Sequence, residues 1–252
     1  MKIVTWNLRY IWKEGDGVNS FVHRAGLIYE KIMAETPDIL AFQEITENSR
    51  NYLMKLFPEY EFFGTLRSEN YDGEGLYTAF RKDTFALMGG DIFWLSPTPY
   101  QAGSRFANQS INPRICVVTK LRNKATNEIF SVYNVHLDDL SDEARREGLT
   151  DVFRVIDENV KIWHTPYILL GDFNAYPDSQ TMQLACSRTD IFDSTKEIQD
   201  TFHGFGRREP EKIDYIFLPK VWQNRVTGVT AWTDTSNGIY LSDHYPVCVI
   251  IK

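Results

Sequence analysis

The stretch YILLGDFNAYP, residues 167–177, begins as an apolar run and ends abruptly in a carboxylate and an amide. A short apolar run that stops at turn-forming residues is typical of a buried strand. Because strand side chains alternate, we expect Asp172 and Asn174 to lie on one side and Phe173 to point the other way into the core. Pro177 then turns the chain away from the sheet. The stretch therefore predicts a central strand with polar groups held at its rigid end.

The bulk composition is that of an ordinary globular protein. The chain has 252 residues, of which 43% are hydrophobic and 24% charged, and one domain of this size can bury a large core. We find no linker, no low-complexity segment and no Gly/Ser tract, so we predict a single domain over residues 1–252.

The charge argues against one class of partner. The net charge is −7, and no basic run is longer than two residues, whereas duplex-binding proteins usually carry a basic face. Stable binding of duplex DNA is therefore not expected. A local basic pocket for a small phosphorylated molecule or a short single-stranded nucleic acid remains compatible with this charge.

The cysteines and the apolar runs bear on the compartment. Cys116, Cys186 and Cys248 are far apart in the sequence and form no CxxC, so we expect core thiols at Cys116 and Cys248 rather than disulfides. No signal-peptide pattern is visible, and no apolar run approaches the ~18 residues of a membrane span. We expect a cytoplasmic protein without a membrane partner.

Hydrophobic periodicity predicts alternating strands and helices. The expected helices cover 23–37, 141–162 with Ser141 as N-cap, and 180–187 with Ser179 as N-cap. The expected strands cover 1–10, 38–45, 60–67, 75–83, 85–96, 113–123, 128–137, 167–174, 213–219, 226–235 and 245–252.

One arrangement occurs twice along the chain. A strand that ends in Asn7 is followed by a helix and by a strand that ends in Glu44. Later, a strand that ends in His136 is followed by a helix and by the strand that ends in Asp172. This weak repeat predicts two similar halves, each a sheet covered by helices, and two such sheets packed face to face make a layered α/β sandwich.

Polar residues recur where the predicted strands stop. A single Asp or Asn after a strand is usually a turn former, but many such positions in one chain call for a common cause. Hard oxygen donors, without neighbouring Cys or a zinc-type histidine spacing, favour Mg²⁺ or Mn²⁺. The positions are Asn7, Glu44, Asn134, His136, Asp172, Asn174, Asp214, Asp243 and His244.

The histidines differ in their surroundings. His136 ends a strand, and His244 stands between an acid and the start of a strand. Either is a candidate for catalysis, although a histidine beside an acid is also a common structural pair. His203 lies in a polar loop, where it is either a turn residue or a substrate contact.

The motifs TWN, QE, NVHL, GDFN, IDYIF and SDH occur in this order from Thr5 to His244. In this they resemble the endonuclease/exonuclease/phosphatase superfamily, the deoxyribonuclease I-like metal-dependent phosphoesterases. The stretch GDFNAYPDS is similar to bacterial members and to the deadenylase-like branch. The resemblance implies a four-layered α/β sandwich of two mixed β-sheets with helices outside.

The resemblance also implies roles for individual residues. Glu44 resembles the main metal ligand, with Asn7 beside it and Asp243 completing the acidic cluster. Asp172 resembles the residue that orients or deprotonates the attacking water, and Asn174 the amide that steadies nucleophile and phosphate. His244 is similar to the histidine that faces the phosphate, Asp214 to the carboxylate that orients it, and His136 to a donor to a nonbridging phosphate oxygen.

Three further residues are candidates for substrate binding. Arg114, just before a predicted strand, is suited either to a phosphate or to a structural ion pair. Tyr77 is a candidate for lining the pocket, although most tyrosines are core or rim residues. The third is the loop residue His203.

These features support three hypotheses. The first is a Mg²⁺/Mn²⁺-dependent hydrolase of phosphate esters (phosphodiesterase, nuclease or phosphatase) that acts on a small or single-stranded phosphorylated substrate. The second is a catalytically silent phosphate- or partner-binding domain on the same fold. Such relatives usually lack an acid or the histidine, and none is missing here. The third is a sequence-specific DNA nuclease, against which the acidic charge argues.

Overall fold

In the computed structural model, which describes residues 1–11 and 15–252, two six-stranded mixed sheets dominate the fold. In spatial order, sheet A contains β11 (Val226–Ala231), β14 (Val247–Ile251), β1 (Lys2–Asn7), β2 (Ile39–Thr46), β4 (Glu74–Arg81) and β3 (Tyr60–Leu66). Sheet B contains β5 (Phe85–Trp94), β6 (Ile115–Asn123), β7 (Ile129–His136), β8 (Tyr167–Asp172), β10 (Asp214–Pro219) and β9 (Ile191–Asp193). A small hairpin consists of β12 (Thr235–Ser236) and β13 (Ile239–Tyr240).

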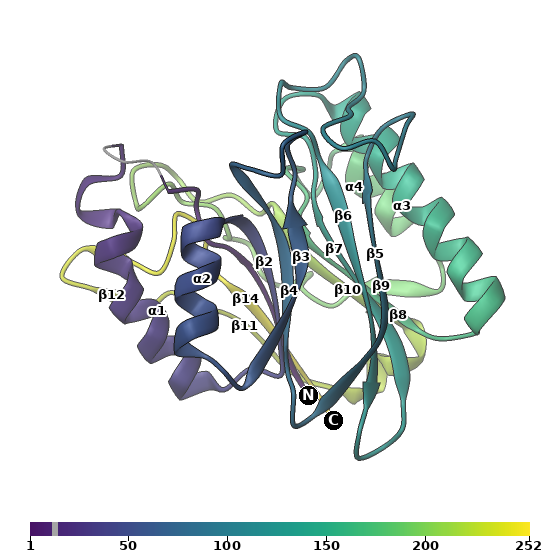
Figure 1. Ribbon diagram of the computed structural model, residues 1–252, viewed down its shortest axis with the longest axis horizontal. Helices are drawn as coiled ribbons and strands as arrows, with labels where there is room; N and C mark the ends of the chain where they lie inside the picture. The colour runs from purple at the N-terminus through teal and green to yellow at the C-terminus, as the bar shows by residue number, and fades with distance from the viewer. Residues whose placement is uncertain (12–14) are drawn as a thin grey trace.

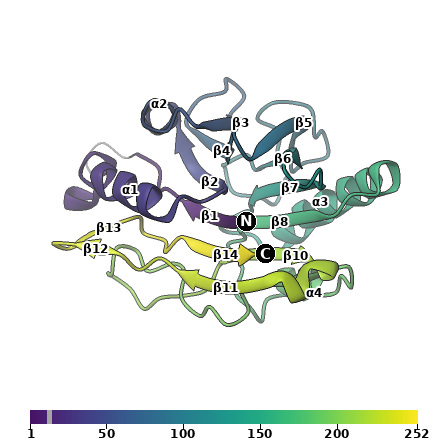
Figure 2. The same ribbon diagram turned by 90° about the horizontal axis from the view of Figure 1, so that it is seen from below.

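The helices cover the outer faces of the two sheets (Figures 1 and 2). On sheet A lie α1 (Phe21–Glu35) and α2 (Glu47–Leu56), and on sheet B lie α3 (Asp142–Trp163) and α4 (Gln180–Cys186). Short 3₁₀ turns occur at η1 (Gly17–Asn19) and η2 (Lys220–Arg225). The predicted four-layered sandwich is confirmed.

The two halves predicted from the sequence are present as two parallel strand pairs. In sheet A, β1 pairs in parallel with β2 through the crossover helix α1. In sheet B, β7 pairs in parallel with β8 through α3. All other pairs within the two sheets are antiparallel. Each parallel pair therefore brings the carboxyl ends of two strands to the same edge.

Three apolar layers hold the sandwich together. Side chains such as Ile3, Ile39, Leu170 and Ile216, all fully buried, fill the space between the sheets. The outer face of sheet A packs against α1 and α2, and the outer face of sheet B packs against α3 and α4. Because every strand of the parallel pairs is covered on both faces, its sequence is nearly continuously apolar.

A buried polar contact joins the two sheets close to their shared edge. Gln43 of β2 donates from Nε2 to Oδ1 of Asn134 in β7 at 2.8 Å, and both side chains are fully buried. Asn134 in turn donates to the carbonyls of Phe42 and Tyr77. Since an unpaired amide would be costly here, these contacts fix how the sheets lie relative to each other.

Capping explains the helix starts. Ser141 accepts a hydrogen bond from the Ala144 amide, and Ser179 accepts one from Met182, as the sequence predicts. Helix α2 was not expected from the sequence. It follows β2 without a loop, because Thr46 and Ser49 form a reciprocal capping box at its start.

The cysteines are unpaired thiols, with Cys116 and Cys248 buried in the core as predicted and Cys186 exposed. Within the described ranges, no helix has the combination of length and apolar character that crossing a bilayer requires.

Gly171 allows the carboxyl end of strand β8 to lie close to the neighbouring strand β7. Its φ is 141°, and a Cβ there would lie 1.9 Å from the carbonyl oxygen of Val135 on the neighbouring strand. Only glycine permits this close approach of β7 and β8 immediately before Asp172.

We expect Gly171→Ala to lower the free energy of unfolding by about 3 kcal/mol or more, because the methyl group forces the paired backbones apart. Urea unfolding measures the change. Gly26→Ala is the matched control, since nothing lies within 4 Å of a Cβ at this position in α1. There alanine is expected to stabilise by up to about 1 kcal/mol. Equal effects of the two substitutions would contradict this account.

Candidate active site

The strand ends of both sheets converge on one cleft of about 710 Å³. Glu44 comes from β2 and Asn7 from the end of β1, whereas His136, Asp172 and Asp214 come from sheet B. Asp243 and His244 lie between β13 and β14. These residues are almost fully buried or border the cleft, although they are distributed over the whole sequence.

Glu44 is turned toward the cleft by a bulge. The register of β2 against β4 shifts between Phe42 and Ile45, and Glu44 adopts a left-handed φ of 54°. A non-glycine residue in this conformation is strained, and bulges of this kind redirect side chains beside functional sites. The carboxylate accepts hydrogen bonds from the Tyr10 amide at 2.7 Å and from Asn7 at 3.0 Å.

Those donors keep Glu44 ionised. Burial by itself raises the pKa of Glu44, but the hydrogen bonds from the Tyr10 backbone and the Asn7 side chain outweigh it, so the pKa lies below its usual value.

Asn7 joins the two sheets at the site. Its Nδ2 donates to Glu44 at 3.0 Å and to Asp172 at 3.0 Å, while its Oδ1 accepts from the Arg9 amide. The structure thus places the amide nitrogen between the two carboxylates, whereas the metal-ligand prediction for Asn7 requires its oxygen there.

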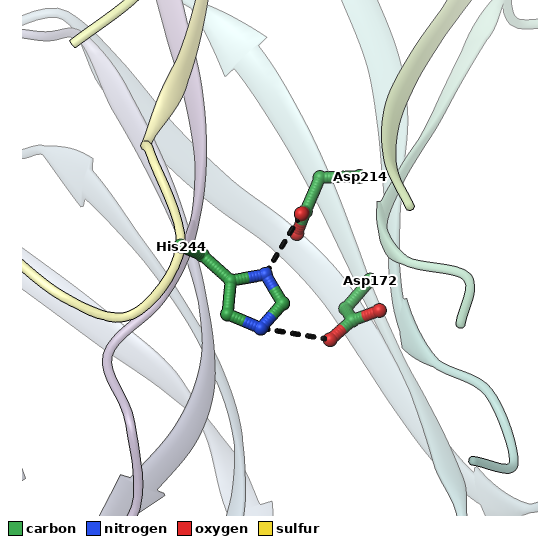
Figure 3. A group of neighbouring side chains, drawn as sticks. All are labelled: Asp172, Asp214 and His244. Atoms are coloured by element: carbon green, nitrogen blue, oxygen red, sulfur yellow. Dashed lines mark hydrogen bonds and ion pairs between the residues drawn. The ribbon is translucent and has the colours of Figure 1, made fainter. Parts of the chain in front are cut away.

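Asp214, His244 and Asp172 form a triad (Figure 3), in which a hydrogen bond joins Asp214 to His244 and an ion pair joins His244 to Asp172. The imidazole of His244 lies with Nδ1 2.8 Å from Asp214 and with Nε2 3.8 Å from Asp172. Burial opposes the charged form of His244, but the negative charge of Asp214 and its hydrogen bond prevail, with smaller contributions from Asp172 and Asp243, and raise the pKa to about 10. His244 is therefore a cation at neutral pH, with a proton on each ring nitrogen.

Asp172 has the properties of a base near neutrality. Burial, followed by the charge of Asp214, raises its pKa to about 7. Its Oδ1 accepts from the Asn174 amide at 2.9 Å. Asn174 itself has a φ of 48° and donates from its side chain to the Leu137 carbonyl. These two hydrogen bonds, one to Asp172 and one to the Leu137 carbonyl, hold the turn after β8 in place.

His136 is a second imidazole at the site and, unlike His244, it is neutral. Its Nε2 lies 3.5 Å from Asp172. Burial, followed by the positive charges of Arg114 and Arg67, places its pKa well below the usual value. A neutral imidazole keeps one ring N–H as a donor.

The structure brings most of the predicted residues to the cleft but not all. Arg114 lies in its wall. His203 does not line it. That imidazole is buried in its loop, accepts from the Gly206 amide and stacks on Tyr245 at a centroid distance of 3.9 Å. Tyr77 does not line it either, because its hydroxyl accepts from Arg50 on the outer side of sheet A.

Several cleft residues were missed from the sequence. Most of them are charged residues in loops or near the ends of helices and strands, where no periodic pattern distinguishes a residue that faces the cleft. Arg9, two residues after Asn7, lies 3.6 Å from Asp243 and pairs with Asp16. The remaining missed residues that line the cleft include Arg67, Glu74, Asp139, Arg145, Tyr176, Arg208 and Glu211.

The donors at the Glu44 end fit a hard divalent cation. Glu44, which is half-buried, and Asp243, which is buried, are carboxylates at the same cleft. Burial, with the charge of Glu44, raises the pKa of Asp243, so the two acids repel each other and a cation between them relieves that repulsion. The Asp172–Asp214–His244 group fits a metal less well, since its protonated imidazole has no free lone pair.

Comparison with known proteins supplies an independent view. A sequence profile described as the endonuclease/exonuclease/phosphatase family matches residues 4–244. The crystal structure of the endonuclease/exonuclease/phosphatase from Bacteroides vulgatus is 27% identical, covers 100% of this chain and 98% of its own, and has a TM-score of 0.91.

Two further structures are similar. The mannosyl-6-phosphatase of Bacteroides thetaiotaomicron is 26% identical over 100% of this chain and 99% of its own, with a TM-score of 0.92. The human Nocturnin catalytic domain with bound sulfate is 20% identical over 100% of this chain and 93% of its own, with a TM-score of 0.77, and so supports the fold alone.

We expect Asn7→Asp to make stability fall more steeply with rising pH than it does in the wild type, where Asp172 already has a raised pKa. A third carboxylate between Glu44 and Asp172 has a folded-state pKa above its unfolded value, so the folded protein holds an extra proton at low pH and loses that advantage as pH rises from about 4 to the folded pKa. The loss is about 1.4 kcal/mol for each pH unit of that window. Urea unfolding at pH 5 and 7, with chelator present, measures it.

The control for this experiment is Asn51→Asp on the exposed face of α2, next to Arg50. We expect its pH dependence to match the wild type. A profile for Asn7→Asp that is no steeper than that of the wild type would mean that the new group is not held between the two carboxylates.

Proposed function

The chain belongs to the endonuclease/exonuclease/phosphatase family, whose members are generally hydrolases of phosphoester bonds, and we propose that it hydrolyses a phosphate ester with the help of Mg²⁺ or Mn²⁺. The observation that carries the proposal is the triad, in which a protonated imidazole and a carboxylate with a pKa of about 7 face each other in the cleft. Such a pair offers one group to accept a proton and another to stabilise negative charge.

The roles follow from the protonation states. Asp172, within the cleft and ionised near pH 7, accepts the proton of the attacking water. His244 donates from Nε2 to a phosphate oxygen, and Asp214 on the opposite ring nitrogen keeps the imidazole charged. His136 adds a neutral donor, and Asn174 holds the loop that carries the base.

Glu44 and Asp243 would hold the divalent cation, which when bound supplies Lewis-acid stabilisation of the phosphoryl oxygens. Asn7 orients the Glu44 carboxylate from the side of β1. Arg9 lies at the Asp243 carboxylate and offsets the negative charge there.

The cleft favours a small or single-stranded phosphorylated substrate. Its volume of about 710 Å³ suits a molecule of metabolite or nucleotide size, and the net charge of −7 disfavours duplex DNA. A relative of 26% identity is a mannosyl-6-phosphatase, which agrees with a small substrate. The three unpaired cysteines suit a reducing compartment, so the proposal includes a cytoplasmic enzyme.

Hydrolysis of bis-p-nitrophenyl phosphate tests the assignment. We expect activity with Mn²⁺ or Mg²⁺ and none after chelation. We also expect Asp172→Asn and His244→Gln each to lower kcat by about 100-fold or more, since each removes a proton-transfer or charge-stabilising group. Asp178→Asn is the matched control, because this exposed acid follows the same strand outside the cleft. Activity of Asp172→Asn within about threefold of wild type would disprove the role of the base.

The pH profile provides a second test. Activity requires ionised Asp172 and protonated His244, so kcat/KM is expected to rise up to about pH 7 and to fall near pH 10. Asp214→Asn removes the charge that outweighs the burial of His244, so the alkaline limb is expected to move to lower pH. If the alkaline limb does not move in Asp214→Asn, then His244 is not the group whose titration produces it.

A further inference from the structure

Two arginines extend the cleft beyond the catalytic centre. Arg67 follows β3 in sheet A, and Arg114 precedes β6 in sheet B, so the sheets contribute one guanidinium each to the same cleft wall. The side chain of Arg67 is 11% exposed and that of Arg114 is 4% exposed. Their charges act on each other, since Arg114 contributes to lowering the pKa of Arg67 after burial.

Arg114 has hydrogen-bonding capacity that the protein does not use. Its Nη2 donates to Asp139 at 2.8 Å, but Nε and Nη1 are buried without a hydrogen-bond partner. The nearest carboxylate oxygen of Asp138 lies 3.9 Å from Nε, which is too far for a hydrogen bond. Leaving charged donors buried and unmatched is costly, so this geometry points to a ligand that accepts from them.

Neighbouring residues hold both the backbone and the guanidinium group of each arginine. The indole of Trp94 donates to the Arg67 carbonyl at 2.7 Å, and the Leu95 amide donates to the Arg114 carbonyl at 2.8 Å. Glu74 pairs with Arg67, and Asp139 with Arg114, which orients both guanidinium groups. The pair is thus a preorganised site rather than two flexible surface chains.

His136 interacts with both the catalytic centre and this pair. Its Nε2 lies 3.5 Å from Asp172. After burial, the positive charges of Arg114 and Arg67 have the largest effect on its pKa, which they lower. Among the described residues, neither arginine makes a hydrogen bond or an ion pair with Asp172 or His244, and the charges with the largest effect on those two groups come from other residues.

We propose that Arg67 and Arg114 form a second anion subsite, and that the substrate is a phosphate ester that carries another acidic group, a phosphate or a carboxylate. The proposal rests on the proposed function in one respect, because it takes the first phosphate to lie at the triad. Arginine is suited to the second group, since its guanidinium binds carboxylates and phosphates through several parallel donors.

Non-hydrolysable probes of matched length test the subsite by calorimetry in excess Mg²⁺. Propylphosphonate has one acidic group, 3-phosphonopropionate adds a carboxylate, and propane-1,3-bisphosphonate adds a second phosphonate; analogues one carbon shorter and longer cover the spacing. We expect at least one doubly acidic probe to bind the wild type about tenfold or more tightly than its single-acid partner, as a charge-assisted hydrogen bond provides. Whichever doubly acidic probe binds more tightly shows whether the second acidic group of the substrate is a carboxylate or a phosphate.

Substitutions test whether the two arginines cause the tighter binding of the doubly acidic probes. In Arg114→Gln and in Arg67→Gln the advantage of the doubly acidic probes is expected to fall below about threefold. Arg154→Gln is the matched control, since this exposed arginine of α3 pairs only with acids of its own helix among the described ion pairs, and it is expected to retain the advantage. Thermal unfolding checks each variant, and Arg67→Gln keeps the test valid if Arg114→Gln does not fold.

Three outcomes would overturn the proposal. They are equal binding of all probes to the wild type, an advantage that survives both substitutions, and an equal loss for every probe in Arg114→Gln, which would place Arg114 on the phosphate at the triad. None of these readouts depends on turnover. A wild type that failed to hydrolyse bis-p-nitrophenyl phosphate would count against the proposed function instead.

Discussion

The buried hydrogen bond between Gln43 and Asn134 is the contact on which the site depends, because it fixes the carboxyl ends of β2 and β7 against each other. Apolar packing between twisted sheets tolerates small sliding motions, whereas a buried amide pair has one satisfied arrangement. With the sheets held at this point, strand ends from both halves meet at one edge. The cleft is therefore a product of sheet packing and not of any single loop.

A second constraint is the accumulation of acids at that edge. Asp172, Asp214 and Asp243 are buried and Glu44 is half-buried, and the protein accommodates them in different ways. Neutral donors stabilise Glu44, the cationic imidazole of His244 lies between Asp172 and Asp214, and Arg9 approaches Asp243. The contacts that stabilise these charges also give Asp172 and His244 different protonation states, which acid–base chemistry needs.

The sequence predicted the sandwich and the strand ends because both follow from periodic patterns and ordered motifs. It placed Asp172, Asp214 and His244 in the site, and the structure brings these three together. It did not anticipate that Asn7 presents its nitrogen to two acids, since that orientation depends on partners 37 and 165 residues away. Arg67 was missed because no pattern distinguishes an arginine after a strand that faces the cleft. His203 lies outside the cleft because it packs within its own loop, and Tyr77 does so because its side chain in β4 packs on the outer side of sheet A.

The strand order has a consequence for how the protein is made. Sheet B comes from one continuous segment, residues 85–219, whereas sheet A combines residues 2–81 with β11 and β14 from residues 226–251. Strand β1 lies in the middle of sheet A and pairs with β14, about 240 residues later. During synthesis, every strand of sheet B therefore emerges before sheet A is complete, and β1 is without its partner β14 over that time. Asp243 and His244 are made after every strand of sheet B, so the cleft can be completed only late in synthesis.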